Sequence, residues 1–162
     1  LLRVRAATHE TNQKKKRTMS ARVAELLAAA ANKDAIAFKG VAADAYYKHM
    51  PLLTLGISNK IHVFGANAPS TEGTHPMTAE HRITAVWVKD QKGEVEYLHE
   101  FDAKATAASI EFALNQPGGN CLLDEAFEEA TDLTPYSLCN THGVWEGPTV
   151  AEESSEDSSS HE

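Results

Sequence analysis

Histidine and cysteine side chains, which are common metal ligands and catalytic groups, gather in three short segments of this sequence. The first segment, Tyr47-Lys48-His49-Met50-Pro51, places one histidine beside a cation and two residues before a proline. A single histidine in such a setting is more typical of an exposed or hydrogen-bonded side chain than of a ligand. On its own, His49 therefore indicates little.

The second segment carries two histidines, His75 and His81, in the run His-Pro-Met-Thr-Ala-Glu-His. Pro76 biases His75 towards an extended backbone, so this segment is predicted to be a loop. On a helix this spacing would place the two rings on different faces, whereas a loop can fold both rings onto one metal ion. A metal site and a structural role are equally compatible with this pair.

The third segment, Cys139-Asn140-Thr141-His142-Gly143, is the most informative run. Asn140 and Gly143 tolerate unusual dihedral angles, so a tight turn can bring the sulfur and the imidazole together while turn amides point at the thiolate. Such hydrogen bonds tune the potential of a bound metal. In isolation, the pair also fits a buried thiol beside a turn histidine. A Cys–His nucleophilic dyad fits less well, because no third orienting residue is apparent.

Taken together, the segments offer four imidazoles and one thiolate as donors: His49, His75, His81, His142 and Cys139. This is one donor more than a closed tetrahedral zinc site uses. Five donors favour a five- or six-coordinate ion, and a mixed nitrogen and sulfur set with an open position suits redox-active iron. Ligand softness alone also admits zinc or copper.

Short β-rich segments surround these donors and predict the elements that position them. They cover residues 60–64, 82–89, 94–101 and 109–114. In the last segment Ile110, Phe112 and Leu114 alternate onto one face, as in a half-buried strand. The connections are too short for crossover helices, so the strands are predicted to pair antiparallel in an all-β sandwich.

Helices are predicted only outside this pattern. Ser20 can cap a short helix over 21–30, which is rich in strong helix formers. Apolar residues at helical spacing favour a second short helix over 121–131. Residues 1–18 carry six basic side chains against one acid, which indicates a disordered basic arm or, as the alternative, part of an organelle transit peptide.

Three units are therefore expected along the chain: a basic arm and helical extension (1–34), a β-sandwich (35–150) and an acidic disordered tail (151–162). The tail is too poor in apolar residues to offset its ordering entropy. A formal net charge of -8 over 162 residues disfavours nucleic acid as a partner. No apolar run is long enough for a membrane span, and two cysteines favour a reducing, cytoplasmic compartment over an organelle.

The three histidine and cysteine segments resemble, in order and spacing, the iron centre of superoxide reductases, which include neelaredoxins and the catalytic domains of desulfoferrodoxins. Lys48-His49-Met50-Pro51 is similar to the Lys-His-Val-Pro of that family, and residues 75–81 are similar to its His-Pro-x-x-x-Glu-His. Residues 139–145 are similar to its Cys-Asn-x-His-Gly-x-Trp. The resemblance covers roughly residues 40–147.

This resemblance implies an immunoglobulin-like sandwich that binds one mononuclear iron, Fe2+ or Fe3+, per chain. The implied ligands are four equatorial imidazoles, from His49, His75, His81 and His142, with Cys139 axial. The implied reaction reduces superoxide by one electron to hydrogen peroxide. A rubredoxin-like or other small electron donor then restores the iron, and the family forms dimers or tetramers.

The chain departs from the family pattern at two points. It lacks the cysteines of a desulforedoxin domain, which implies a one-iron form. Tyr47 stands where most members have a glutamate that closes the sixth position of the oxidised iron. Water, hydroxide or the Tyr47 phenolate are the candidate replacements.

Lys48 is expected to act in catalysis by raising the local positive potential, which attracts the superoxide anion even to an acidic protein. Two alternatives remain open at this stage. One is an iron-binding or electron-transfer module on the same fold without efficient superoxide reduction. The other is a zinc-stabilised β-domain that serves as an interaction module.

Overall fold

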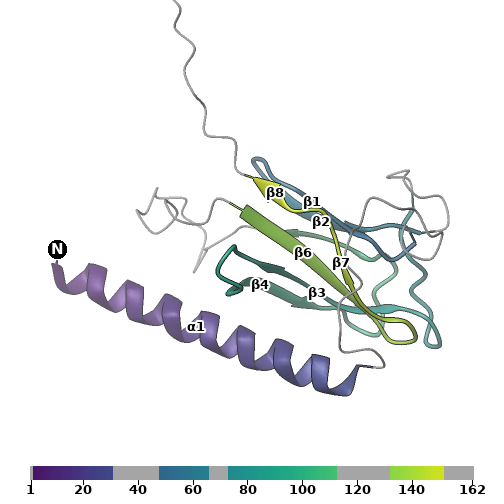
Figure 1. The fold of residues 1–162 in the computed structure, drawn as a ribbon, viewed down its shortest axis with the longest axis horizontal. Coiled ribbons are helices and arrows are strands. Elements are labelled where there is room, and N and C mark those ends of the chain that lie inside the picture. The colour runs from purple at the N-terminus through teal and green to yellow at the C-terminus, as the bar shows by residue number, and fades with distance from the viewer. Residues whose placement is uncertain (1, 31–47, 66–72, 113–131, 152–162) are drawn as a thin grey trace, which may run out of the picture.

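The computed structural model describes residues 2–30, 48–65, 73–112 and 132–151, with side chains described from His9 onward. Within these ranges, one helix, α1 (Leu2–Ala29), precedes eight strands that form two sheets (Figure 1). The helix lies along the outside of one sheet, and the sheets pack face to face.

All strand pairs within the two sheets are antiparallel. One sheet has the order β1-β2-β5, and the other has the order β4-β3-β6-β7 with β8 paired to the start of β6. The bounds are Pro51–Thr54 (β1), Asn59–Val63 (β2), Ile83–Lys89 (β3), Val95–Glu100 (β4), Ser109–Phe112 (β5), Asp132–Cys139 (β6), Gly143–Glu146 (β7) and Val150–Ala151 (β8). The predicted immunoglobulin-like β-sandwich is thereby confirmed.

The four strands predicted from the sequence correspond to β2, β3, β4 and β5. Ile110 and Phe112 pack against the core, as their alternation predicts, while residues beyond 112 in that segment lie outside the described range. The main core fills the space between the sheets. Its buried members are Leu53, Ile61, Val63, Ile83, Val86, Val88, Ala108, Leu133 and Cys139.

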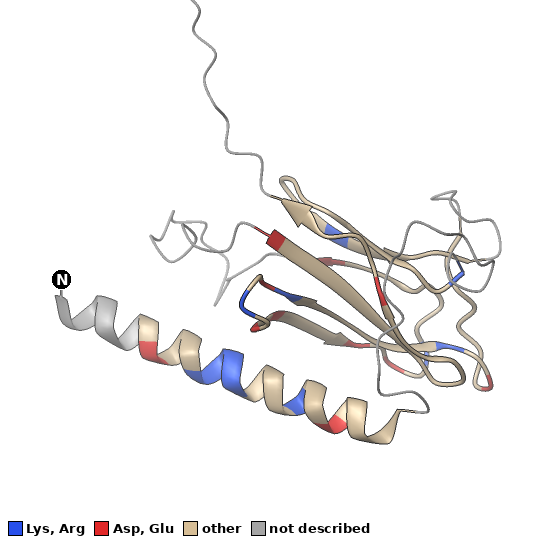
Figure 2. Cartoon of the chain, viewed as in Figure 1, with Lys and Arg blue, Asp and Glu red and all other residues tan. Residues whose placement is uncertain are grey.

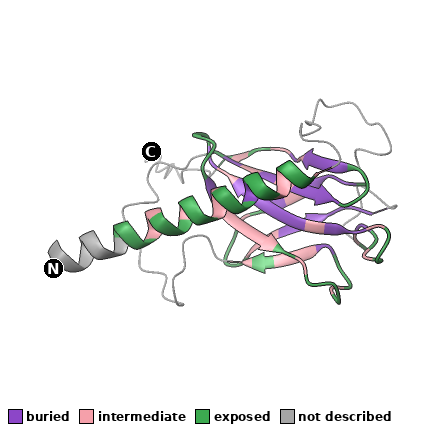
Figure 3. Ribbon diagram, turned by 90° about the horizontal axis from the view of Figure 1, so that it is seen from below, coloured by how far each residue is buried: buried purple, intermediate pink, exposed green. Residues whose placement is uncertain are grey.

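Strand β3 is apolar on both faces because both faces are covered. Val86 and Val88 point into the core between the sheets, whereas Ala85 and Trp87 belong to a second cluster on the outer face. Helix α1 closes this second cluster with Val23, which is 2% exposed. Figure 3 shows the exposed side of the helix against the buried strands behind it. Complete burial of each such apolar side chain contributes roughly 1.5–3 kcal/mol.

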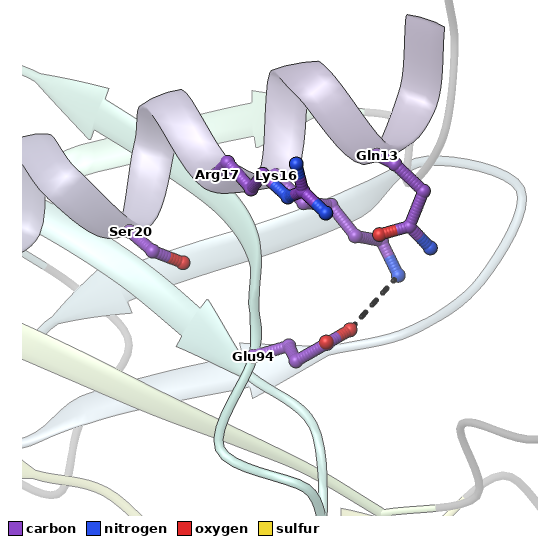
Figure 4. A pocket seen from close by; sticks show the side chains of 5 residues that line it. All are labelled: Gln13, Lys16, Arg17, Ser20 and Glu94. Atoms are coloured by element: carbon purple, nitrogen blue, oxygen red, sulfur yellow. Dashed lines mark ion pairs between the residues drawn. The ribbon is translucent and has the colours of Figure 1, made fainter. Parts of the chain in front are cut away.

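Ion pairs also attach α1 to the sheet, from basic residues in the charged middle of the helix (Figure 2). Lys16 Nζ lies 2.6 Å from Oε1 of Glu96, whose side chain is only 4% exposed, and 3.7 Å from Glu94 (Figure 4). Arg22 lies 2.7 Å from Glu100. Burial raises the pKa of Glu96, and the Lys16 ammonium opposes that rise.

Helix α1 is longer than the sequence predicts. It begins at Leu2 rather than after Ser20, so the expectation of a disordered arm over 1–18 is wrong for the described residues. The physical reason is that no glycine or proline interrupts the first 39 residues, and the inner side of α1 finds partners on β4. The helix predicted over 121–131 and the acidic tail beyond residue 151 lie outside the described ranges. No described helix is both long and apolar enough to cross a membrane.

Candidate metal centre

Three connections at one end of the sandwich bring the histidine and cysteine segments together. His49 lies in the turn that leads into β1, while His75 and His81 lie between β2 and β3. Cys139 ends β6, and His142 lies in the turn to β7. Because the start of β3 pairs with the end of β6, the loop that carries His81 is placed beside this turn.

The side chains of all five predicted donors form one cluster. The ligand atoms of His49, His81, Cys139 and His142 all lie within 4.8 Å of one another. Nδ1 of His142 lies 3.0 Å from Nε2 of His49 and 3.5 Å from the Cys139 sulfur. His75 completes the cluster, with its ring centroid 4.7 Å from that of His49 and 4.5 Å from that of His81.

The protonation state of His75 follows from its hydrogen bond. Its Nδ1 lies 2.8 Å from the carbonyl oxygen of Pro76, which can only accept, so Nδ1 carries the proton and donates it. The other nitrogen, Nε2, is then a bare lone pair. It is buried and has no hydrogen-bond partner in the described structure. Burial, together with the neighbouring rings, lowers the pKa of His75 to about 4, so this lone pair stays free near neutral pH.

His81 repeats this pattern. Its Nε2 is also buried without a hydrogen-bond partner, and burial followed by the charge of His142 lowers its pKa. Leaving buried polar atoms unpaired costs about 1–3 kcal/mol each. Two such nitrogens on neighbouring rings are the atoms that a metal ion would satisfy.

Cys139 is 1% exposed, and burial raises the pKa of its thiol. The backbone N–H groups of Thr141 and His142 point at the sulfur and oppose that rise. A coordinated metal ion deprotonates such a thiol outright, and the two amides then stabilise the thiolate. Gly143 makes this turn feasible, since its φ of 83° lies in the left-handed region that favours glycine.

The donor set fits a metal ion with more than four ligands. Four imidazoles and a thiolate exceed the closed tetrahedral set of zinc, and the mixture of nitrogen and sulfur suits redox-active iron. The two unpaired nitrogens and the thiol that is shielded from water are the observations that favour a bound ion over a hydrogen-bonded histidine cluster.

Asn140 fastens the Cys139 turn to the loop that carries His81. Its Oδ1 accepts a hydrogen bond from Arg82 N at 2.9 Å, and its own N–H donates to the Arg82 carbonyl at 3.0 Å. Thr141 Oγ1 donates to the Glu80 carbonyl at 3.1 Å. These bonds hold two of the three donor segments in a fixed relation without using any donor atom.

One side of the cluster faces solvent. His142 and Lys48 are exposed, whereas His49 and His75 are buried. A small molecule therefore has access to the cluster from the side of His142. Tyr47, at the position of the expected glutamate, lies outside the described residues.

A second group of potential ligands within the described ranges, Asp90, Glu94 and Glu96, lies at the β3–β4 turn. This acidic group has a structural role, because the Lys16 ammonium of α1 forms ion pairs with Glu94 and Glu96 and so occupies the place that a cation would take. Asp90 also accepts hydrogen bonds from two backbone N–H groups of the turn, at 2.9 Å each.

Two buried polar residues near the centre are not among the predicted donors. His62 donates from Nε2 to the Gly73 carbonyl at 2.9 Å and so anchors the chain just before His75. Ser137 on β6 hydrogen-bonds to the backbone of His49. No sequence signal marks Ser137 except its place two residues before Cys139.

One family model and several solved structures are similar to this chain. A family model described as Desulfoferrodoxin matches residues 42–148 of the chain. The chain is similar to the superoxide reductase from Treponema pallidum, with 32% sequence identity over 67% of this chain and 71% of that chain, and a TM-score of 0.44. It is also similar to a superoxide reductase (1Fe-SOR) from Giardia intestinalis, with 19% identity over 64% of this chain and 97% of that chain, and a TM-score of 0.46. No curated protein matches the chain.

Proposed function

Because this chain belongs to the desulfoferrodoxin family, we propose that it is a superoxide reductase, an oxidoreductase that reduces superoxide by one electron to hydrogen peroxide at a single non-haem iron. The observation that carries this proposal is the convergence of five donors, among which His75 keeps a buried, unprotonated Nε2. A cluster built only for stability would have paired that nitrogen.

The proposed ligands are the imidazoles of His49, His75, His81 and His142 and the thiolate of Cys139. Burial lowers the pKa of His75 and His81, so these two rings stay neutral and protons do not compete with the metal for their nitrogens. The thiolate is shielded from water and receives two backbone N–H groups, so its charge is stabilised inside the fold.

When bound, ferrous iron supplies the single electron and an open position for superoxide. Two protons from solvent complete hydrogen peroxide, and no oxygen is formed. The exposed side of the cluster, next to His142 and Lys48, is where superoxide enters and peroxide leaves. An external one-electron donor of the rubredoxin type then returns the centre to its reduced state.

Lys48 is the proposed electrostatic guide for the substrate. It is exposed and directly precedes His49, whereas the chain as a whole carries a formal net charge of -8. A local cation at the entrance can raise the encounter rate of an anion by about 10- to 1000-fold even on an acidic protein.

The test is stopped-flow spectroscopy of the anaerobically prepared ferrous protein mixed with a pulse of superoxide. A superoxide reductase consumes superoxide in a fast second-order step, yields one peroxide per oxidised iron and releases no oxygen. Bound iron without this reaction would support an iron-binding or electron-transfer module instead. Zinc in place of iron would reject both.

A further inference from the structure

A buried hydroxyl outside the donor set lies directly behind the metal centre. Ser137 is fully buried, and its Oγ donates to the carbonyl oxygen of His49 at 2.7 Å. The two residues are 88 positions apart in the sequence, so the bond joins β6 to the turn that leads into β1. It fixes the backbone of His49 relative to the strand that ends in Cys139.

The ring of His49 is held by the neighbouring strand. Trp145 on β7 stacks against it, with ring centroids 4.5 Å apart and planes inclined by 11°. Trp145 is 5% exposed and packs with Met50 and Phe64, so its own orientation is fixed. Since the strand register pairs Ser137 with Trp145, one cross-strand pair contacts both the backbone and the ring of His49.

The residues that follow His49 are held by backbone contacts. Phe64 N donates to the carbonyl oxygen of Met50 at 3.2 Å. Gly147 packs so closely on Pro51 that a Cβ at this glycine would collide with the Pro51 carbonyl. The direction in which the chain leaves His49 is therefore set, and the Ser137 bond and the Trp145 stack determine the orientation of His49 itself.

We propose that Ser137 and Trp145 are positioning residues that orient His49 for the metal ion. The β6–β7 hairpin then provides two donors, Cys139 and His142, and sets the direction of a third that arrives from a distant part of the chain. This inference rests on the proposed function only in assuming that the five side chains bind a metal ion. It does not require that superoxide be reduced.

The first test measures the affinity of the full-length, metal-free protein for Co2+, followed through its thiolate-to-metal absorption in competition with a chelator. Ser137→Ala removes the donor and should weaken Co2+ binding about 10-fold or more, as loss of an outer-shell partner typically does. Thr84→Val is the matched control, because it also removes a hydroxyl that donates to a backbone carbonyl. Thr84 Oγ1 on β3 donates at 3.3 Å to the carbonyl of Leu138, which follows Ser137 on β6. This control should leave the affinity within about 2-fold of wild type, well below that outer-shell effect.

Variants of Trp145 provide an independent test should Ser137→Ala fail to fold. Trp145→Phe keeps an aromatic face beneath His49 and should retain most of the affinity, whereas Trp145→Leu should lose about 10-fold. In the metal-free protein, the ring-current shift of the His49 ring protons reports the stack. It should persist in Thr84→Val, decrease in Ser137→Ala and decrease most in Trp145→Leu, where only the neighbouring imidazole rings still contribute.

Equal affinities for wild type, Ser137→Ala and Trp145→Leu would overturn the inference, as would a wild-type protein that binds no Co2+. Normal Co2+ affinities and the expected ring-current shifts, combined with a ferrous protein inert to superoxide, would uphold the positioning roles and reject the proposed reaction. The two failures are therefore distinguishable.

Discussion

The face covered by α1 and the end that carries the histidines share strands β3 and β6, yet they are built in opposite ways. Under α1 the apolar side chains of Val23, Trp87 and Val144 pack together, and the charges of Lys16 and Arg22 meet acids on β4. The apolar packing and the ion pairs of this face therefore stabilise the folded protein.

At the histidine end, burial leaves polar atoms unsatisfied. The Nε2 atoms of His75 and His81 are buried without hydrogen bonds, and the thiol of Cys139 is buried with a raised pKa. Such an arrangement destabilises the protein until a ligand satisfies it. The comparison teaches that stability and metal binding are assigned to different regions of one sandwich, and so they should respond to different substitutions.

Cys139→Ser should have the largest effect on the metal centre. Serine fits the site, but its hydroxyl is a poor ligand for this ion, so the thiolate-to-iron absorption should vanish. The rate with superoxide should fall at least about 100-fold, because even outer-shell changes cost about 10- to 100-fold. Visible spectroscopy and stopped flow measure both. A variant that kept its colour and rate would exclude Cys139 as a ligand.

Metal removal should lower the stability of the folded protein. With free metal at a hundred times its dissociation constant, binding to the native state alone adds about 2.7 kcal/mol to the free energy of unfolding. Thermal unfolding with and without a chelator measures this difference. If the chelator left the unfolding temperature unchanged, the cluster would not hold a metal.

Lys16→Met should act on the opposite region. It leaves the Glu96 carboxylate, whose side chain is 4% exposed, without its cation and should lower the free energy of unfolding by about 1–3 kcal/mol. The pKa of Glu96 should rise further above its usual value, as followed by carbon NMR. Metal affinity should not change. A loss of metal affinity in Lys16→Met would contradict the separation of the two regions.

The metal-free protein should become less stable as the pH falls. Because the pKa of His75 is held at about 4 in the folded state against 6.5 in the unfolded chain, the unfolded state binds more protons between these values. The free energy of unfolding should therefore decrease from about pH 6.5 towards pH 4. Denaturant titrations across this range measure the slope, and His75→Leu should reduce it. An unchanged slope in that variant would argue against a buried neutral His75.

Lys48→Ala should have the smallest effect. Loss of one exposed cation beside the entrance should slow the second-order reaction with superoxide by about 3- to 10-fold at low ionic strength, and less at high salt. Lys92→Ala on the β3–β4 turn is the control, since it also removes one exposed lysine but from a turn outside the donor segments. Equal rates in the two variants would reject a local role for Lys48.

The strands and the donor segments could be predicted because their signals are local. Alternation marks Ile110 and Phe112, and turn-forming residues surround Cys139 and His142. The length of α1 could not be predicted in this way. The side of α1 that faces the sheet carries Lys16, which is stabilised there by an ion pair with Glu96. Glu96 lies 80 positions away in the sequence, so the local sequence of the helix does not show this partner.

The same limit applies to the residues that orient the donors. The bond from Ser137 to His49 spans 88 positions, and the stack of Trp145 on that histidine depends on the register of two strands. A sequence shows which side chains can bind a metal. It does not show which neutral neighbours hold them, because those contacts follow from the folded sheet.

The most direct test of the central claim is X-ray absorption spectroscopy at the iron edge of the anaerobically purified protein. We predict an iron ion with four nitrogen ligands and one sulfur ligand, and loss of the sulfur contribution alone in Cys139→Ser. A first shell of nitrogen and oxygen only, or a protein that carries no iron, would contradict the assignment of this end of the sandwich as the catalytic centre.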